Sequence, residues 1–268
     1  AQTVVSLDGT ERAVTFMSAG ESAEPPDVGF RIGDPSGVEG GAADVLGATG
    51  EITGSVIYGD PGEIEDLEIF PGDFTTESDT GDGEGAGEGA LVSAGFARIS
   101  LTDSNGDPIT DFSGDSTALV TMRVPAGVQN PETGGAVSPG DSIPVFAFNE
   151  DTGEWIVDYD NDGMVKRAIV QQDADGMFVE FEVSHLSWWN LDWKSPQCPE
   201  GTPLFRFVDG DGNPVEGVTA YADFPGGYGY NYSNWAFGEA FIEDDFVAFV
   251  QAPANLDWFF WAEKDGET

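Results

Sequence analysis

The sequence predicts an all-β fold made of β-sandwiches, and three observations support this. First, no stretch of about twelve or more residues keeps the i, i+3, i+4 apolar pattern of an amphipathic helix without a glycine or proline inside it. Second, the 268 residues include 37 glycines and 16 prolines, which break helices and mark turns. Third, short alternating or β-branched runs recur between turn-forming clusters, a spacing typical of sandwiches.

The expected strands can be followed from the N-terminus to the C-terminus. Each run is rich in β-branched or aromatic residues, and turn-forming residues separate the runs. Examples, in chain order, are "RAVTFM" (12–17), "GSVIYG" (54–59), "FARISLTD" (96–103), "STALVTMRVP" (116–125), "PVFAFNE" (144–150), "EWIVDYD" (154–160), "MFVEFEV" (177–183), "LFRFVD" (204–209), "VTAYADF" (218–224) and "FVAFVQA" (246–252).

Composition divides the chain at two places. The stretch "SDTGDGEGAGEGA" (78–90) has no large apolar residue, so we expect an exposed, mobile loop or linker there. The stretch "KSPQCPEG" (194–201) has two prolines and no apolar periodicity, which suits a joint between domains. We therefore predict an N-terminal β-region over residues 1–88, a central β-sandwich over 89–194 and a smaller C-terminal sandwich over 199–268.

The charge of the chain excludes several classes of partner. Nine basic residues stand against fifty acidic ones, which gives a formal net charge of −41. Such a chain repels DNA, RNA and anionic membranes. Most carboxylates lack a basic partner, so they must lie dispersed on a surface that salt screens or divalent cations neutralise. Saline surroundings, marine or halophilic, or bound calcium would relieve the repulsion.

Other features predict a secreted protein. No apolar run approaches the roughly 18 residues that span a bilayer, so no membrane span is expected. A start at "AQ" is what cleavage of a signal peptide after a small-residue site would leave. Cys198 is the sole cysteine, which excludes an internal disulfide framework.

One turn pattern occurs twice. "LTDSNGDPI" (101–109) and "FVDGDGNPV" (207–215) share an Asp, a Gly three residues later and a Pro two residues after that. Asp103 and Asp209 can accept backbone N–H bonds in an Asx turn, while Gly106 and Gly212 supply positive φ. An ordinary hairpin turn explains both copies of the pattern, and the repetition favours two Ig-like units in tandem.

A calcium site and an acidic hairpin turn are the two interpretations of "DYDNDG" (158–163). The segment matches the first half of an EF-hand loop. The twelfth position is Ile169 instead of a bidentate Glu, and no helices flank the loop, so an EF-hand is excluded. A looser calcium site would use Asp158, Asp160 and Asp162, and "QQDADG" with Asp173 and Asp175 is a weaker candidate of the same kind.

Catalysis has little support in the sequence. A metal-dependent active site would need more than the one histidine present, and no nucleophile-elbow motif accompanies Ser184 or Ser187. We expect no enzymatic activity and no cofactor apart from calcium.

An aromatic segment is the main candidate for a contact surface. "YADFPGGYGYNYSNWAFG" (221–238) combines aromatic residues with Gly and Asn. Three interpretations stay open: a protein interface, packing onto the sandwich and its edge, or a platform for stacking on sugars. The candidate residues for an interface or ligand site are Tyr228, Tyr230, Tyr232 and Trp235.

"VSHLSWWNLDW" (183–193) places three of the seven tryptophans beside the histidine. An alternating strand would send Val183, His185, Ser187 and Trp189 to one face and Leu186, Trp188 and Asn190 to the other. We expect this segment to close a domain structurally, with His185 bonded to a neighbouring turn. The residues to which we assign this structural role are His185, Trp188, Trp189, Asn190 and Asp192.

Residues 91–193 resemble a β-sandwich module of large secreted bacterial surface proteins. The resemblance runs through "LVSAGFARISLTDSNGDPI", "STALVTMRVPAG" and "SIPVFAFNEDTGEWIVD", and ends in an HxSxWNxD-type motif at 185–192. Residues 201–268, with "GTPLFRFVDGDGNPVEGVTAYA" and "NWAFGEAFI", resemble a carboxypeptidase-regulatory-like (transthyretin-like) β-sandwich. These resemblances imply tandem Ig-like and transthyretin-like sandwiches that serve display, spacing or adhesion outside the cell.

The sequence thus predicts an extracellular structural protein that assembles with copies of itself, as a subunit of a filament, sheath or surface layer. An adhesin or a carbohydrate-binding surface module is the alternative. If an assembly forms, its interfaces must avoid bringing carboxylates together, so strand edges and aromatic residues are the expected contacts.

Overall fold

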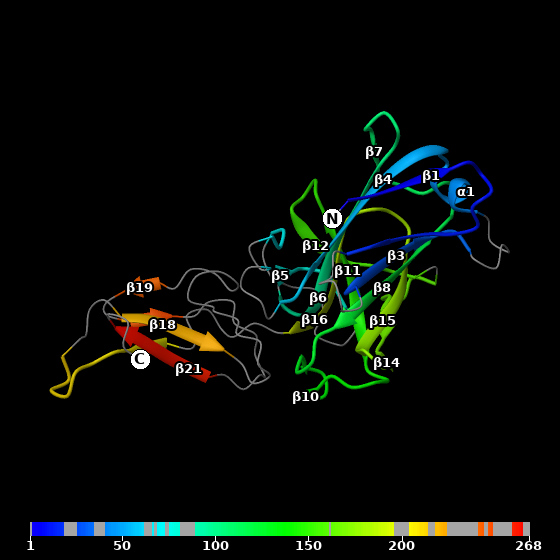
Figure 1. The fold of residues 1–268 in the computed structure, drawn as a ribbon. Coiled ribbons are helices and arrows are strands. Elements are labelled where there is room, and N and C mark those ends of the chain that lie inside the picture. Colours follow the sequence, from blue (N-terminus) through cyan, green and yellow to red (C-terminus); the bar gives the residue numbers. More distant parts are fainter. Residues whose placement is uncertain are drawn as a thin grey trace.

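The structure, a computed structural model, describes residues 2–18, 26–34, 41–61, 66, 69–72, 75–80, 89–160, 162–195, 204–213, 218–223, 241–243, 246–248 and 259–264. Within these residues there are many antiparallel strands and one short helix, α1 (Ala42–Leu46), which confirms the all-β prediction (Figure 1). No helix in the described part of the chain is long and apolar enough to cross a membrane.

The larger sheet, sheet A, is antiparallel and takes strands from residues 2 to 195. Its strand order is β1-β4-β6-β16-β11-β12, and the short strands β5 and β7 pair with β6 while β13 pairs with β11. The bounds are β1 (Gln2–Leu7), β4 (Gly50–Gly59), β5 (Thr75–Thr76), β6 (Gly89–Thr102), β7 (Pro108–Ile109), β11 (Ser142–Asn149), β12 (Glu154–Val157), β13 (Arg167–Ile169) and β16 (Trp188–Ser195).

The smaller sheet, sheet B, has the order β14-β15-β8-β3-β2. Its strands are β2 (Val14–Met17), β3 (Val28–Ile32), β8 (Ala118–Val124), β14 (Gln171–Asp173) and β15 (Gly176–Val183). The remaining described strands form small sheets: β9 (Gln129–Asn130) with β10 (Gly135–Ala136), β17 (Leu204–Arg206) with β20 (Phe246–Ala248) and β19 (Phe241–Glu243), and β18 (Val218–Asp223) with β21 (Phe259–Lys264).

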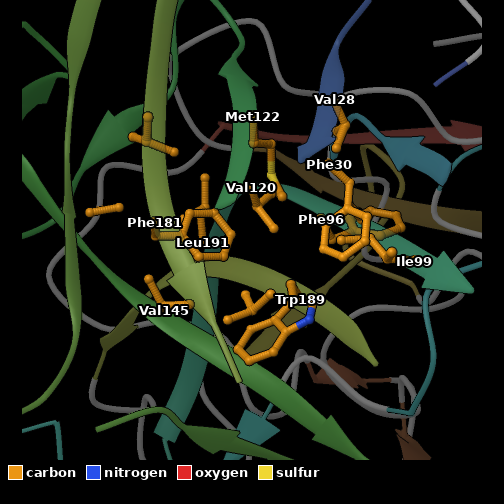
Figure 2. Packing of buried hydrophobic residues seen from close by; sticks show 14 of the residues in the cluster. Val28, Phe30, Phe96, Ile99, Val120, Met122, Val145, Phe181, Trp189 and Leu191 are labelled. Atoms are coloured by element: carbon orange, nitrogen blue, oxygen red, sulfur yellow. The ribbon is translucent and has the colours of Figure 1, made fainter. Parts of the chain in front are cut away.

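Sheets A and B pack face to face around one apolar core. Figure 2 shows Val120, Met122 and Phe181 of sheet B together with Val145, Trp189 and Leu191 of sheet A. The Trp189 and Phe181 rings lie 6.2 Å apart between centroids. Removing this much apolar surface from water is the main favourable contribution to the stability of the sandwich.

The N-terminal strands belong to this same sandwich. β1 and β4 extend sheet A beyond β6, and β2 and β3 extend sheet B beyond β8. The boundary that composition predicts at residue 88 lies between β5 and β6, which pair through Thr75 with Ala90 and Thr76 with Gly89. Gly-rich composition marks a connection but does not tell whether it joins two domains or two strands of one sheet.

Phe70, Pro71 and Thr76 cover the outer side of sheet A near β12 and extend the apolar core there. The Phe70 ring stacks on Trp155 at 5.0 Å and meets Phe96 edge-on at 4.9 Å. The Thr76 hydroxyl donates to the Trp155 carbonyl at 2.7 Å, and the Trp155 indole N–H donates to the Pro71 carbonyl at 3.0 Å. The outer face of sheet A is therefore covered at this end and open at the β1 end.

Candidate functional site

In the described part of the chain, most carboxylates lie outside the strands. Of the 32 acidic residues there, nine fall within strands. These nine are Glu51, Glu154, Asp173, Glu180, Glu182, Asp192, Asp223, Glu243 and Glu263. Concentrating the charge in turns and loops leaves the sheet surfaces close to neutral.

The clearest neutral surface is the outer side of β1, β4 and the second half of β6, which we call the open face. On the other side of these strands, Ile52, Val56 and Ile99 are buried in the sandwich core, so the alternate side chains point outward. Cross-strand partners lie on the same face. The open face comprises Gln2, Val4, Ser6, Glu51, Thr53, Ser55, Ile57, Arg98, Ser100 and Thr102.

The open face has an aliphatic and hydroxyl centre with two charged residues. Val4 is 60% exposed and Ile57 is 37% exposed, which is high for large apolar side chains. Glu51 and Arg98 are the two charged residues, and both are exposed. Neither forms an ion pair within the described part of the chain, whereas Arg98 lies over the Trp188 ring at 5.4 Å. The face is therefore formally neutral on a protein of net charge −41.

The edge beside the open face is also uncharged. Strand β1 reads "QTVVSL" and pairs with β4 along its whole length. It stands at the end of the strand order of sheet A, so its other side offers backbone N–H and C=O groups for pairing. Edge strands usually carry charges, proline or a bulge that discourages pairing with another chain. β1 carries no charge or proline, and its register with β4 is continuous.

Three acidic turns share one backbone geometry, and the structure thus extends the repeat that the sequence shows. Asp103 Oδ1 accepts the N–H groups of Asn105 at 2.8 Å and Asp107 at 3.0 Å. Asp209 Oδ1 accepts those of Asp211 and Asn213, both at 2.9 Å. Gly106 and Gly212 each have a φ of 85°. Hydrogen bonds to the ionised form lower the pKa of both residues: chiefly the Asn105 N–H for Asp103, and chiefly the Asn213 side-chain amide, followed by its N–H, for Asp209.

The predicted calcium ligands belong to the third copy of this turn. Asp160 Oδ1 accepts the N–H groups of Asp162 and Met164, both at 2.9 Å, and Gly163 has a φ of 76°. Asp158 forms an ion pair with Lys166. In the described part of the chain no three His, Cys, Asp or Glu side chains gather in a metal-binding arrangement. The hairpin-turn interpretation accounts for these contacts, and calcium binding stays a hypothesis. In the weaker candidate, Asp173 pairs with Arg123 at 2.8 Å.

His185 lies between the two strands that the sequence joins into one. β15 ends at Val183 and β16 begins at Trp188, so the single alternating strand expected from 183 to 189 is interrupted at residues 184–187. An isolated antiparallel β-bridge joins His185 to Asp111 there, and Leu186 N–H donates to the Thr110 carbonyl at 2.8 Å. Within β16, Trp189 and Trp188 do point to opposite faces, toward Phe181 and Phe96 respectively.

A groove of about 590 Å³ runs beside His185, between the β6–β7 and β11–β12 hairpins. Ile109, Phe148, Asn149 and Asp158 are among its lining residues. The His185 ring packs on Trp189 at 4.9 Å, and its Nδ1 lies 3.4 Å from the Ser184 hydroxyl. Burial lowers the pKa of His185, although the Asp158 and Asp111 carboxylates act in the opposite direction. The groove offers mixed polar and apolar contacts to a small ligand.

A buried polar cluster lies on the paired strands β6 and β16. Asn190 and Asp192 of β16 are fully buried, and the Ser93 hydroxyl donates to Asn190 Oδ1 at 2.8 Å. Gly95 N–H donates to Ser93 Oγ at 3.3 Å, at the bulge where β6 shifts register against β16. Both carboxylate oxygens of Asp192 lack a hydrogen bond to any described residue. Burial raises the pKa of Asp192 well above its usual range.

The aromatic candidates Tyr228, Tyr230, Tyr232 and Trp235, and also Cys198, lie outside the described residues. Sequence reasoning missed the open face. A usable signal was present, because "QTVVSL" (2–7) and "FARISL" (96–101) are free of acid in a chain where acids are abundant. The pairing that brings these two runs onto one face with β4 could not be predicted from either run alone.

Comparisons with known proteins found no matching family model, no matching curated protein and no matching solved structure.

Proposed function

We propose that this chain is an extracellular structural protein that assembles with copies of itself, as a subunit of a filament, sheath or surface layer. The observation that supports this most directly is the combination of the neutral open face with the uncharged edge strand β1 on a chain of net charge −41. Surfaces rich in carboxylates keep copies apart. A neutral face and edge provide a place where two copies can meet without that repulsion.

The distribution of charge also gives the assembly its specificity. Copies that approach through their turns meet Asp103, Asp107 or Asp160 and are repelled. Copies that approach through Val4 and Ile57 bury exposed aliphatic surface instead. The open face therefore combines the apolar surface that stabilises contact with the weakest electrostatic repulsion. The acidic turns disfavour every orientation in which two copies meet through them.

Salt should strengthen this assembly. The remaining long-range repulsion between two highly acidic copies weakens as the screening length falls from about 8 Å at physiological ionic strength to about 3 Å at 1 M salt. Calcium would act in the same direction by neutralising carboxylates. Saline surroundings outside the cell meet this requirement.

Sedimentation velocity of the purified chain across a salt series, with electron microscopy of the same samples, tests the proposal. We expect monomers at low ionic strength and ordered assemblies at high ionic strength. A protein that stays monodisperse and monomeric at every salt concentration contradicts self-assembly. Assemblies that remain intact after dialysis into low-salt chelating buffer contradict the predicted salt dependence.

An adhesin or carbohydrate-binding module is the second candidate, and the His185 groove favours it. Asn149 and Asp158 supply hydrogen-bonding groups there, beside the apolar surface of Phe148 and Ile109. Binding to a glycan array that Trp235→Ala or Asn149→Ala abolishes, while the protein stays monomeric, would support the module over the structural subunit.

A further inference from the structure

We propose that the open face is a two-fold symmetric interface, in which Glu51 of one copy pairs with Arg98 of the partner subunit. This inference rests on the proposed self-assembly and identifies the contact that carries it. Its basis is the placement of the two charged residues at opposite ends of a neutral surface.

The register of β4 and β6 sets the distance between these charges. Arg98 pairs directly with Ile57, whereas Glu51 lies six residues before Ile57 on the same strand. At about 3.3 Å per residue, the two ends of the open face are roughly 20 Å apart along the strands. The outward residues between them on β4 are Thr53 and Ser55, and neither carries a charge.

A two-fold axis makes this pattern complementary to itself. The axis lies in the interface, runs across the strands and passes over the middle of the Glu51–Ile57 segment. Rotation about it reverses the strand direction, so the end of one copy that carries Glu51 meets the end of the partner that carries Arg98. Each dimer then gains the pair twice, as an isologous interface requires. An arrangement that stacks two copies with parallel strands would instead place like charges together.

The rest of the face suits contact with a copy of itself. Val4 and Ile57 are exposed aliphatic side chains that this packing removes from water. Thr53, Ser55 and Ser100 are partly exposed hydroxyl residues, which can hydrogen-bond across the interface without burying charge. Sheets that pack face to face stand about 10 Å apart, a spacing that side chains of this size fill.

Charge exchange provides the test. Glu51→Arg and Arg98→Glu should each weaken association by roughly tenfold or more, since each replaces two attractive pairs with two repulsive ones. The double variant Glu51→Arg/Arg98→Glu should recover affinity close to that of the wild-type chain, because the pairs are restored with their signs exchanged. Sedimentation equilibrium is run at the lowest salt concentration at which the wild-type chain associates.

Two control variants correct for the change in net charge. Glu180→Arg and Arg31→Glu alter the charge by the same amounts on the outer side of sheet B, and we expect a smaller effect from each. Circular dichroism checks that all variants are folded. If Glu51→Arg and Arg98→Glu behave as their controls do, or if the double variant is no better than either single one, this interface is wrong although self-assembly stands. If the wild-type chain never associates, both proposals fail.

Discussion

Asp192 lies directly opposite Ser93 in the ladder between β16 and β6, and its side chain is completely excluded from solvent. Neither carboxylate oxygen has a hydrogen bond to a described residue, because the Ser93 hydroxyl donates its proton to Asn190. A buried carboxylate without a partner is costly when ionised and much less so when protonated. A protonated Asp192 also has an O–H group that it can donate to Ser93. This position therefore favours the neutral acid over the carboxylate.

The first prediction is that Asp192→Asn stabilises the protein at pH 7. Burial raises the pKa of Asp192 in the folded state, whereas the unfolded chain releases the proton above about pH 3.9. Stability therefore falls as pH rises from that value to the folded-state pKa, by at most about 1.4 kcal/mol per pH unit. Asparagine is neutral and of similar size, so it removes this loss.

Urea unfolding of the wild-type chain and of Asp192→Asn at a series of pH values measures the difference in their free energies of unfolding. We expect the two curves to lie close together near pH 4 and to separate with increasing pH. The more distant surface change Asp115→Asn serves as a control. A constant difference across the pH range would mean that Asp192 is ionised in the folded protein.

The second prediction concerns His185, whose pH dependence has the opposite sign. Burial lowers its folded-state pKa, and the unfolded chain takes up a proton at about pH 6.5. The contribution of neutral His185 to stability is thus complete above pH 6.5 and is lost as the pH falls below it. Since the chain has one histidine, the ring protons can be followed individually by NMR.

His185→Gln should remove this part of the pH dependence between about pH 7.5 and 5.5. Both proteins in this comparison also carry Asp192→Asn, because that substitution removes the opposing pH dependence that Asp192 contributes. A ring that titrates at or above pH 6.5 in the folded protein would show that the Asp158 and Asp111 carboxylates outweigh burial.

The third prediction follows from the shared turn geometry. Gly212→Ala should destabilise the turn at Asp209 by about 1 kcal/mol, because a residue with a Cβ atom is strained at its φ of 85°. Open space surrounds the position, so steric contact does not contribute. Gly210→Ala, in the same turn but at an ordinary φ and also in open space, is the matched control.

Hydrogen exchange of the Asn213 amide, which donates to Asp209, measures the effect locally. We expect faster exchange in Gly212→Ala and unchanged exchange in Gly210→Ala. Equal effects of the two substitutions would show that the left-handed conformation is not required.

The fourth prediction concerns calcium. We expect calcium to raise the melting temperature no more than magnesium does at equal ionic strength, because Asp160 Oδ1 already accepts two N–H groups and Lys166 pairs with Asp158. Calorimetric titration of chelated protein gives a second measurement. A calcium-specific increase that Asp162→Asn abolishes would instead establish the site at residues 158–162.

The sequence alone was sufficient for many of the strands and turns. The alternation in "MFVEFEV" (177–183) and the Asp and Gly spacing in "LTDSNGDPI" (101–109) are local patterns, and the structure contains the corresponding strand and turn. Local backbone preferences and a period of two residues determine such features without help from distant parts of the chain. The excess of carboxylates was equally visible, and with it the exclusion of anionic partners.

Only the tertiary structure decided which strands share a sheet and which side chains share a face. Pairing of β1 with β4, and of β4 with β6, joins segments about 50 residues apart and creates the open face between Glu51 and Arg98. Long-range pairing of β16 with β6 likewise holds Asp192 in the interior, where burial raises its pKa. These results depend on pairing register and on burial, which are properties of contacts between distant segments, and no single segment carries that information.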